Sequence, residues 1–240
     1  MQGLTIKRIE RLMNIIRANS EASNLKPCVL SDFDDTAAHQ NVAELLLNKF
    51  GDPTWTAIRA NFRKGDLTLK DYQEIVFRNI ATDIPTMQKH VQQHASLRPY
   101  FGELAEYCCV NDYPMAIVSQ GLDFYIQALL DYEGYGSIPV FAVNTTVNGN
   151  AISYQYDYVR PGKESFGNSK GLIVNEYQKK GHRVYYIGDG RSDFEAAVEA
   201  DIVFAHSVLA EECQRQNIPF IPFTDFGDVL SALQSDQGKT

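Results

Sequence analysis

The sequence predicts an α/β protein built on a mainly parallel sheet, with a helical insertion near its start. Two observations predict this class: short apolar runs alternate with helical patterns along most of the 240 residues, whereas the stretch 42–94 carries helical patterns only. Alternating strands and helices favour a parallel sheet, because parallel neighbours need long crossover connections. The apolar content of 44% is enough for one sizeable core, or for a core with a small added domain.

The first expected elements are a helix at 4–19 and a strand at 27–33. Apolar residues recur at helical spacing in 4–19, with most charged residues on other faces, as in a helix that packs on a core. The run from Pro27 to Phe33 is typical of a buried strand. It leads into the acidic segment DFDDT at 32–36, at the carboxyl end of the strand, where open parallel sheets bind ligands.

Four helical patterns follow without a strand signal: VAELLLNKF, PTWTAIRANFRK, LTLKDYQEIVFRNIA and PTMQKHVQQHA. Pro53 and Pro85 stand where a proline in the first helical turn is tolerated. We therefore expect a core domain made of 1–40 and 95–240, including the N-terminal helix, and a small α-helical cap domain at 41–94 inserted into it.

From residue 100 onward the alternation of helix and strand resumes. Asn148 and Gly149 stand between two β-rich runs, which predicts a small antiparallel hairpin. Helices are expected at 100–110, 122–133, 169–180, 192–199 and 208–216, and strands at 115–119, 138–143, 183–189, 202–205 and 219–223.

Composition and charge exclude several classes of protein. The formal net charge of -8, with no cluster of Lys and Arg, argues against nucleic-acid binding. The four cysteines lack CxxC spacing and nearby histidines, so we expect buried reduced thiols instead of a zinc site or disulfides. The first residues lack the apolar stretch of a secretory signal, and no run approaches the length of a membrane span. We expect a cytoplasmic protein that binds neither nucleic acid nor membranes.

Paired carboxylates suggest a metal site. Asp32 and Asp34 follow the first strand, and two carboxylates in one cavity are costly unless a cation neutralises them. Mg²⁺ prefers such oxygen ligands and leaves room for a substrate phosphate. Asp189, in GDGRSD at 188–193, follows another predicted strand and supplies a third carboxylate. The competing interpretation is that Asp32 and Asp34 only cap the next helix.

Small hydroxyl residues and a lysine complete a candidate phosphate site. Thr36 and Ser119 follow strands, where hydroxyl and backbone N–H groups can hold phosphate oxygens. Gly121 allows close approach of the backbone, and Gln120 lies in the same VSQG loop. Lys170 opens a predicted helix and can balance the negative charges.

Two of these assignments have rivals. Lys163 competes with Lys170 for the phosphate, and either can instead be an ordinary surface lysine. Asp193 is placed to orient the metal or its waters without binding the metal directly, or else to serve as an acid in the first turn of a helix.

Taken in order, these segments resemble the motifs of the haloacid dehalogenase (HAD) superfamily of phosphohydrolases: DxDx[TV], a Ser or Thr after a strand, a Lys, and a GDxxxD-type acidic motif. The resemblance runs from about Pro27 to Phe223. It implies a Rossmann-like core, Mg²⁺ as cofactor and a phosphatase that forms an aspartyl-phosphate. Asp32 would be the nucleophile and a metal ligand. Asp34 would be the general acid and base, with its main-chain carbonyl on the metal, and Asp189 a further metal ligand.

The helical insertion resembles the C1-type cap of the phosphoserine-phosphatase branch, which implies a small phosphorylated metabolite as substrate. Within that branch, the tail VLAEECQRQNIPFIPFTDF resembles the methionine-salvage phosphatases that act on 2-hydroxy-3-keto-5-methylthiopentenyl-1-phosphate. Two residues depart from the pattern. Asp35 replaces the usual Gly, and we expect it to be a solvent-facing helix cap. Asn41 stands about where phosphoserine phosphatases carry a Glu for the substrate ammonium group, which disfavours phosphoserine.

Specificity is expected to depend on the cap and on one motif loop. Arg59, Phe62 and Arg63 share a helical face and are candidates to touch the leaving group, although solvated arginines on an amphipathic helix explain them too. Arg191, inside GDGRSD, is a further candidate. The alternatives left open are a phosphomutase of the same superfamily and a non-catalytic domain that binds a phosphorylated ligand. The sequence leaves the oligomeric state open.

Overall fold

The computed structural model describes residues 25–78, 80, 82–148 and 151–237. The Cα positions group into two compact units. The first comprises the described parts of Met1–Asp32, Arg98–Ala116 and Gly171–Thr240, and the second comprises those of Phe33–Leu97 and Ile117–Lys170. The helix expected at 4–19 lies outside the described residues. The cap expected at 41–94 stays a prediction, because this grouping does not test it.

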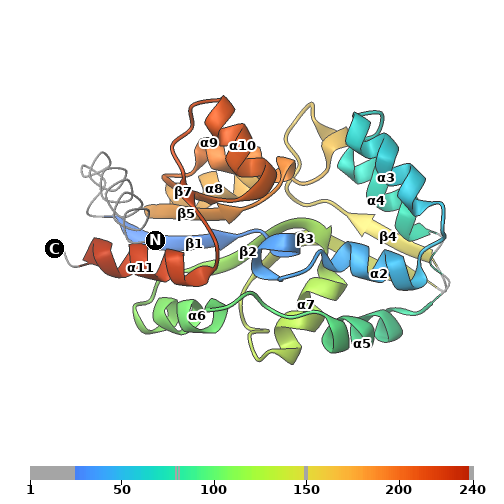
Figure 1. The fold of residues 1–240 in the computed structure, drawn as a ribbon, viewed down its shortest axis with the longest axis horizontal. Coiled ribbons are helices and arrows are strands. Elements are labelled where there is room, and N and C mark those ends of the chain that lie inside the picture. The colour runs from blue at the N-terminus through green and yellow to red at the C-terminus, as the bar shows by residue number, and fades with distance from the viewer. Residues whose placement is uncertain (1–24, 79, 81, 149–150, 238–240) are drawn as a thin grey trace, which may run out of the picture. The chain divides into compact units, whose positions relative to one another are not determined.

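Seven strands form a mostly parallel sheet in the order β4-β3-β2-β1-β5-β6-β7 (Figure 1). The predicted α/β class is confirmed. The strands are β1 (Lys26–Ser31), β2 (Met115–Leu122), β3 (Val140–Asn148), β4 (Ala151–Gln155), β5 (His182–Gly188), β6 (Ile202–Ala205) and β7 (Ile221–Pro222).

The first unit is built around β1, β5, β6 and β7, which pair in parallel in that order. Residues Val29 and Leu30 of β1 and Val184 to Ile187 of β5 are fully buried, as expected of strands covered on both faces. The helices of this unit are α6 (Phe101–Val110), α8 (Lys170–Lys179, from Gly171 on), α9 (Phe194–Glu199), α10 (Ser207–Arg215) and α11 (Phe226–Gln237), with the short 3₁₀ helix η4 (Arg191–Asp193).

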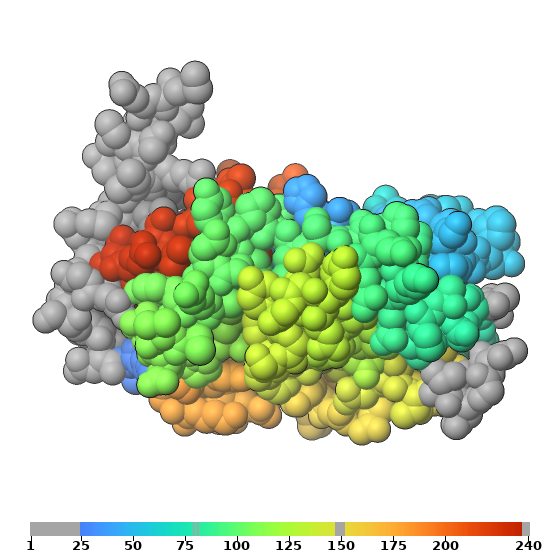
Figure 2. Space-filling model, turned by 90° about the horizontal axis from the view of Figure 1, so that it is seen from below, coloured from blue at the N-terminus to red at the C-terminus, as the bar shows by residue number. Residues whose placement is uncertain are grey.

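The second unit holds most of β2, together with β3, β4 and the helices of the predicted insertion. Helix α5 lies beside α7, where Gln88 and Gln92 donate side-chain hydrogen bonds to the carbonyls of Phe124 and Ala128 (Figure 2). The elements are the kinked turn η2 (Phe33–Ala37), α2 (Val42–Phe50), α3 (Trp55–Lys64), α4 (Leu69–Arg78), α5 (Ile84–His94), α7 (Asp123–Tyr132) and the 3₁₀ helix η3 (Glu164–Phe166).

The predicted hairpin is confirmed, since β3 and β4 pair antiparallel from Asn144↔Gln155 to Asn148↔Ala151. Two elements differ from expectation. The last strand covers only Ile221–Pro222, because Pro219 and Pro222 have no N–H to donate to a ladder. The helix expected at 192–199 begins instead as η4 and becomes α-helical at Phe194.

Within the described part of the chain, every helix is too short or too polar to cross a membrane.

Candidate active site

Three carboxylates of the first unit meet beyond the ends of β1 and β5. These strands pair in parallel up to Ser31↔Ile187, and the Asp32 N–H donates a 2.9 Å hydrogen bond to the Ile187 carbonyl. The two strands therefore end side by side, and Asp32 and Asp189 leave them at the same edge. One carboxylate oxygen from each of Asp32, Asp189 and Asp193 lies within 4.8 Å of the other two.

Asp193 stabilises the loop that carries Asp189. One of its oxygens accepts hydrogen bonds from the backbone N–H groups of Asp189 and Gly190, at 3.1 and 2.9 Å, and the other accepts one from the Tyr186 hydroxyl at 2.5 Å. A Cβ on Gly188 would stand 2.6 Å from the Asp193 carboxyl carbon, so only glycine fits there. Burial, and then the charge of Asp193, hold the pKa of Tyr186 far above its ordinary value, which keeps the hydroxyl a donor.

The acidic trio fits a hard divalent cation. Asp32 is buried, at 6% exposure, and Asp193 is fully buried. Like charges this close in a buried place repel strongly unless a cation or a proton offsets them. Carboxylate oxygens are the ligands Mg²⁺ prefers, and a pair of carboxylates with water and substrate oxygens meets its octahedral requirement. Both oxygens of Asp193 accept the hydrogen bonds that hold the Asp189 loop.

Asp34, in the second unit, is held by three donors. Its Oδ1 accepts from the N–H groups of Val42 at 2.7 Å and Ala43 at 3.2 Å, in the first turn of α2, and its Oδ2 accepts from the Tyr125 hydroxyl at 2.8 Å. Asp34 therefore helps to cap α2, although Asn41 is the N-cap residue, and this contact does not exclude a catalytic role. Burial raises the pKa of Asp34 to about 6, against the lowering effect of these three hydrogen bonds.

Asp35 is not the solvent-facing helix cap that we expected. It is half-buried, its backbone is left-handed at φ 59, and its carboxylate accepts a 3.0 Å hydrogen bond from the Asn41 side chain. The left-handed backbone at this position suits glycine, and aspartate is among the other residues that tolerate this conformation. Asn41 in turn caps α2 by accepting from the Glu44 N–H at 2.9 Å.

The candidate phosphate-binding residues Thr36, Ser119, Gln120, Gly121 and Lys170 all belong to the second unit. Thr36 is fully buried, and Ser119 is 3% exposed with its hydroxyl accepting a 2.9 Å hydrogen bond from the Gly121 N–H. Gln120 stays a candidate for the phosphate, and its side-chain amide donates a 2.6 Å hydrogen bond to the Asn168 carbonyl. It therefore anchors the segment that leads to Lys170.

The two candidate lysines differ in burial. Lys170 is 2% exposed at the start of α8, whereas Lys163 is exposed just before η3. Asn168 fixes the approach to Lys170, because its side chain donates to the Ala142 carbonyl at 2.9 Å and accepts from the Tyr158 N–H at 3.1 Å. A buried lysine held by an ordered segment suits a charged ligand better than an exposed one.

The candidate specificity residues have structural partners. Arg59 forms an ion pair with Glu44 and lies over the Trp55 ring, 5.7 Å from its centroid. Phe62 stacks on Tyr72, with ring centroids 5.1 Å apart.

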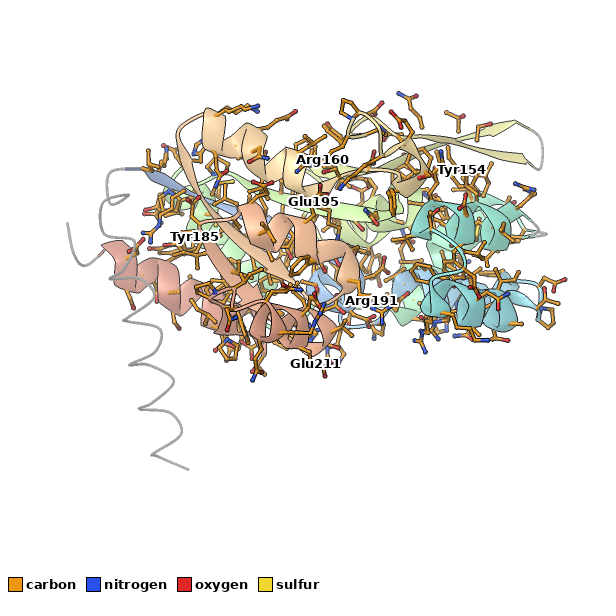
Figure 3. The ribbon with its side chains drawn as sticks, turned by 90° about the horizontal axis from the view of Figure 1, so that it is seen from above. Tyr154, Arg160, Tyr185, Arg191, Glu195 and Glu211 are labelled. Atoms are coloured by element: carbon orange, nitrogen blue, oxygen red, sulfur yellow. The ribbon has the colours of Figure 1, made fainter. Side chains whose placement is uncertain are left out.

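The remaining two candidates are the arginines Arg63 and Arg191. Arg63 lies close enough to Arg59 to contribute to lowering its pKa, after burial as the main cause. Arg191 is exposed in η4, in the first unit (Figure 3).

Sequence reasoning missed Tyr125, Tyr186 and Asn168. Tyr125 lies four residues after Gly121 at the start of a helix, and Asn168 two residues before Lys170, so proximity to a motif was the available signal. Nothing in the local pattern distinguishes Tyr186 from a core tyrosine.

The chain was compared with protein-family models and with known proteins. Residues 29–197 match the family model described as haloacid dehalogenase-like hydrolase. A 2-hydroxy-3-keto-5-methylthiopentenyl-1-phosphate phosphatase of Lysinibacillus sphaericus is 27% identical over 218 residues, which cover 88% of this chain and 95% of the relative. A polyol phosphate phosphatase of Saccharomyces cerevisiae is also 27% identical, covering 88% of this chain and 93% of the yeast protein.

Solved structures show the same fold. A phospho-aspartyl intermediate analogue of phosphoserine phosphatase matches with a TM-score of 0.65 at 16% identity, over 87% of this chain and 99% of that one. A HAD-family hydrolase from Salmonella enterica serovar Typhi matches with a TM-score of 0.66 at 17% identity, over 87% of this chain and 72% of that one. The predicted family and enzyme class are confirmed: the chain belongs to the haloacid dehalogenase-like hydrolase family, among its phosphatases.

Proposed function

We propose that the protein is a Mg²⁺-dependent phosphohydrolase that cleaves a small phosphorylated metabolite through an aspartyl-phosphate on Asp32. One observation carries the proposal: the carboxylates of Asp32, Asp189 and Asp193 gather within 4.8 Å beyond the ends of two adjacent parallel strands. Family membership supports it, because the matched segment includes all three residues.

In the proposed first step, an Asp32 carboxylate oxygen attacks phosphorus, and the bond from phosphorus to the leaving oxygen breaks. Asp34 gives its proton to that leaving oxygen. In the second step Asp34 takes a proton from water as the water oxygen attacks phosphorus, and the bond between phosphorus and Asp32 breaks. Inorganic phosphate is released and both carboxyl groups return to their starting states. Only Phe33 separates Asp32 from Asp34, so the chain itself keeps the two groups near each other.

The other residues bind and orient. Asp32, Asp189 and the main-chain carbonyl of Asp34 would hold Mg²⁺, whose charge would reduce the repulsion between the phosphate and the carboxylates. Asp193 holds the Asp189 loop in place. Thr36, Ser119 and Lys170 would bind the phosphate oxygens and so position phosphorus for attack.

The substrate we propose first is 2-hydroxy-3-keto-5-methylthiopentenyl-1-phosphate, on the strength of the relative from Lysinibacillus sphaericus and the tail of the chain. Polyol phosphates are a second candidate, since the yeast relative of equal identity is named for them. Arg59, Phe62, Arg63 and Arg191 are the residues we propose for contact with the leaving group.

A panel of phosphorylated metabolites, assayed for inorganic phosphate with Mg²⁺ and with EDTA, tests the proposal. The panel includes the methionine-salvage substrate, several polyol phosphates, a sugar phosphate and phosphoserine. We expect Mg²⁺-dependent phosphate release from one of the first two classes. Release of an isomerised sugar phosphate without free phosphate indicates a mutase, and no reaction with any member, under either condition, indicates a ligand-binding domain.

A further inference from the structure

The second unit carries a tyrosine that the family motifs do not include. Tyr125 lies in the first turn of α7, and its hydroxyl donates a 2.8 Å hydrogen bond to Oδ2 of Asp34. Among the described residues that donate to that carboxylate, Tyr125 is the one that uses its side chain, since Val42 and Ala43 contribute backbone N–H groups. The orientation of the Asp34 carboxyl group therefore depends on where this hydroxyl is held.

The tyrosine ring has little freedom to move. Tyr125 is 1% exposed, and its ring packs against Phe33, with centroids 6.1 Å apart, and edge-on against Phe124 at 5.5 Å. Phe33 is the direct neighbour of Asp34 in the chain and is fully buried. The ring and the carboxylate are thus held by the same hydrophobic packing, which fixes the hydrogen bond between them.

Gly121 leaves the space that this hydrogen bond occupies. A Cβ on Gly121 would collide with the Tyr125 hydroxyl, stand 2.9 Å from the ring carbon that carries it, and stand 3.0 Å from Oδ2 of Asp34. The φ of Gly121 lies outside the left-handed region, so its backbone conformation is open to other residues. Crowding by Tyr125 and Asp34 is therefore the physical reason for glycine at this position.

We propose that Tyr125 is a positioning residue for Asp34, and that Gly121 is glycine in order to admit the Tyr125 hydroxyl. The inference rests on the proposed function, in which Asp34 hands a proton to the leaving oxygen while the bond from that oxygen to phosphorus breaks. Tyr125 fixes Oδ2, so the carboxyl group presents its proton in one orientation. Without the hydroxyl, only the two N–H groups that bind Oδ1 hold the carboxyl group, so the position of Oδ2 varies more and fewer encounters have the proton aligned with the leaving oxygen.

The test separates proton delivery from other steps by varying the leaving group. Rapid-quench experiments measure the first release of alcohol from an alkyl phosphate, whose leaving oxygen needs a proton, and of p-nitrophenolate from p-nitrophenyl phosphate, which leaves without one. For Tyr125→Phe we expect a fall of about 10-fold or more with the alkyl phosphate and less than about 3-fold with the aryl phosphate, at similar KM. Equal rates for variant and wild type, or equal losses with both esters, overturn the inference.

Gly121→Ala provides an independent variant, also if Tyr125→Phe fails to fold. It should reproduce the selective loss of rate with the alkyl phosphate. The rate of the double variant should fall no further than that of the slower single variant, because both changes break the same hydrogen bond between Tyr125 and Asp34. Wild-type rates for Gly121→Ala, or additive losses, contradict the role assigned to the glycine.

Two controls complete the design. Tyr185→Phe removes another buried tyrosine hydroxyl, which belongs to the first unit and donates a 2.6 Å hydrogen bond to Asp236. Figure 3 shows Tyr185 well apart from Arg191, which lies in the same unit. It should leave both rates unchanged, and a selective loss in this variant contradicts a specific role for Tyr125.

Asp34→Asn tests the proposed function itself. If Asp34→Asn shows the selective loss and Tyr125→Phe does not, the positioning role alone is wrong; if Asp34→Asn shows none, the general-acid role is wrong.

Discussion

The hydroxyl of Tyr186 donates a 2.5 Å hydrogen bond to Asp193, and both side chains are fully buried. With the two backbone N–H groups of Asp189 and Gly190, this hydroxyl supplies the third donor to a carboxylate at the centre of the acidic trio. The position of Asp189 therefore depends on a tyrosine that need not contact any ligand.

Replacing Tyr186 by Phe should weaken both the fold and the metal site. The variant leaves a buried carboxylate with one donor fewer, which costs about 1–3 kcal/mol of unfolding free energy. It should also lower Mg²⁺ affinity by about 10-fold, since residues that orient metal ligands typically matter to this degree. Urea unfolding and Mg²⁺ titration calorimetry measure the two effects.

Tyr154→Phe is the matched control. The Tyr154 hydroxyl is buried and has no hydrogen-bond partner within the described part of the chain, so its removal should leave stability unchanged or slightly higher. Unchanged Mg²⁺ affinity in Tyr186→Phe would contradict the role of Asp193 in holding the Asp189 loop.

Substitutions of the two candidate lysines should have very different effects on kcat/KM. Lys170→Met removes a buried positive charge proposed to bind phosphate, and we expect kcat/KM to fall by about 100-fold, as when one preorganised donor to a developing charge is lost. Lys163→Met changes an exposed residue and should leave kcat/KM within about 2-fold, since surface substitutions away from a site have small effects. Steady-state kinetics measures both values of kcat/KM. A larger loss in Lys163→Met than in Lys170→Met would assign the phosphate to Lys163.

The left-handed backbone of Asp35 predicts opposite outcomes for two substitutions. Asp35→Gly relieves the conformational cost while losing the Asn41 hydrogen bond, so stability should change by less than about 1 kcal/mol. Asp35→Val places a β-branched side chain at φ 59 and should lose at least about 2 kcal/mol. Urea denaturation of both variants checks this, and a stable Asp35→Val variant would show that the turn is not left-handed.

The cysteines should react unequally with a thiol reagent. Cys109 is exposed, whereas Cys28, Cys108 and Cys213 are buried. Burial, as the main cause, raises the pKa of Cys108 to about 12 and of Cys213 to about 11, and raises that of Cys28 further, so these thiols stay protonated through neutral pH. Titration with a chromogenic disulfide at pH 8 should give one fast equivalent that Cys109→Ser removes; several fast equivalents in the native protein would contradict this burial.

Parts of this fold could be predicted because burial leaves a direct pattern in the sequence. Strands β1 and β5 are covered on both faces, so Val29, Leu30 and the VYYI run read as continuous apolar stretches. Asn41 and Asp83 cap α2 and α5 through side-chain oxygens, as their residue types suggest. The motif aspartates were found because the ends of adjacent parallel strands meet at one edge.

The rest depends on tertiary contacts that local patterns do not encode. Tyr125 reaches Asp34 across 91 residues of sequence, and Gln120 reaches Asn168 across 48. Neither separation leaves a periodic signal, and tyrosine and glutamine have many other uses in a core or on a surface. Helix α11, which packs Phe226 edge-on against Phe101 of α6, was not predicted either, although its buried residues Phe226, Val229 and Leu233 recur at helical spacing.

The central claim is that Asp32 attacks phosphorus in a Mg²⁺-dependent reaction. Asp32→Asn keeps the size of the side chain but removes the charged nucleophile. The decisive measurement is phosphate release from p-nitrophenyl phosphate by wild type and Asp32→Asn, each with Mg²⁺ and with EDTA. We predict turnover only for wild type with Mg²⁺. Substantial turnover by Asp32→Asn, in a preparation free of other phosphatases, would contradict the claim.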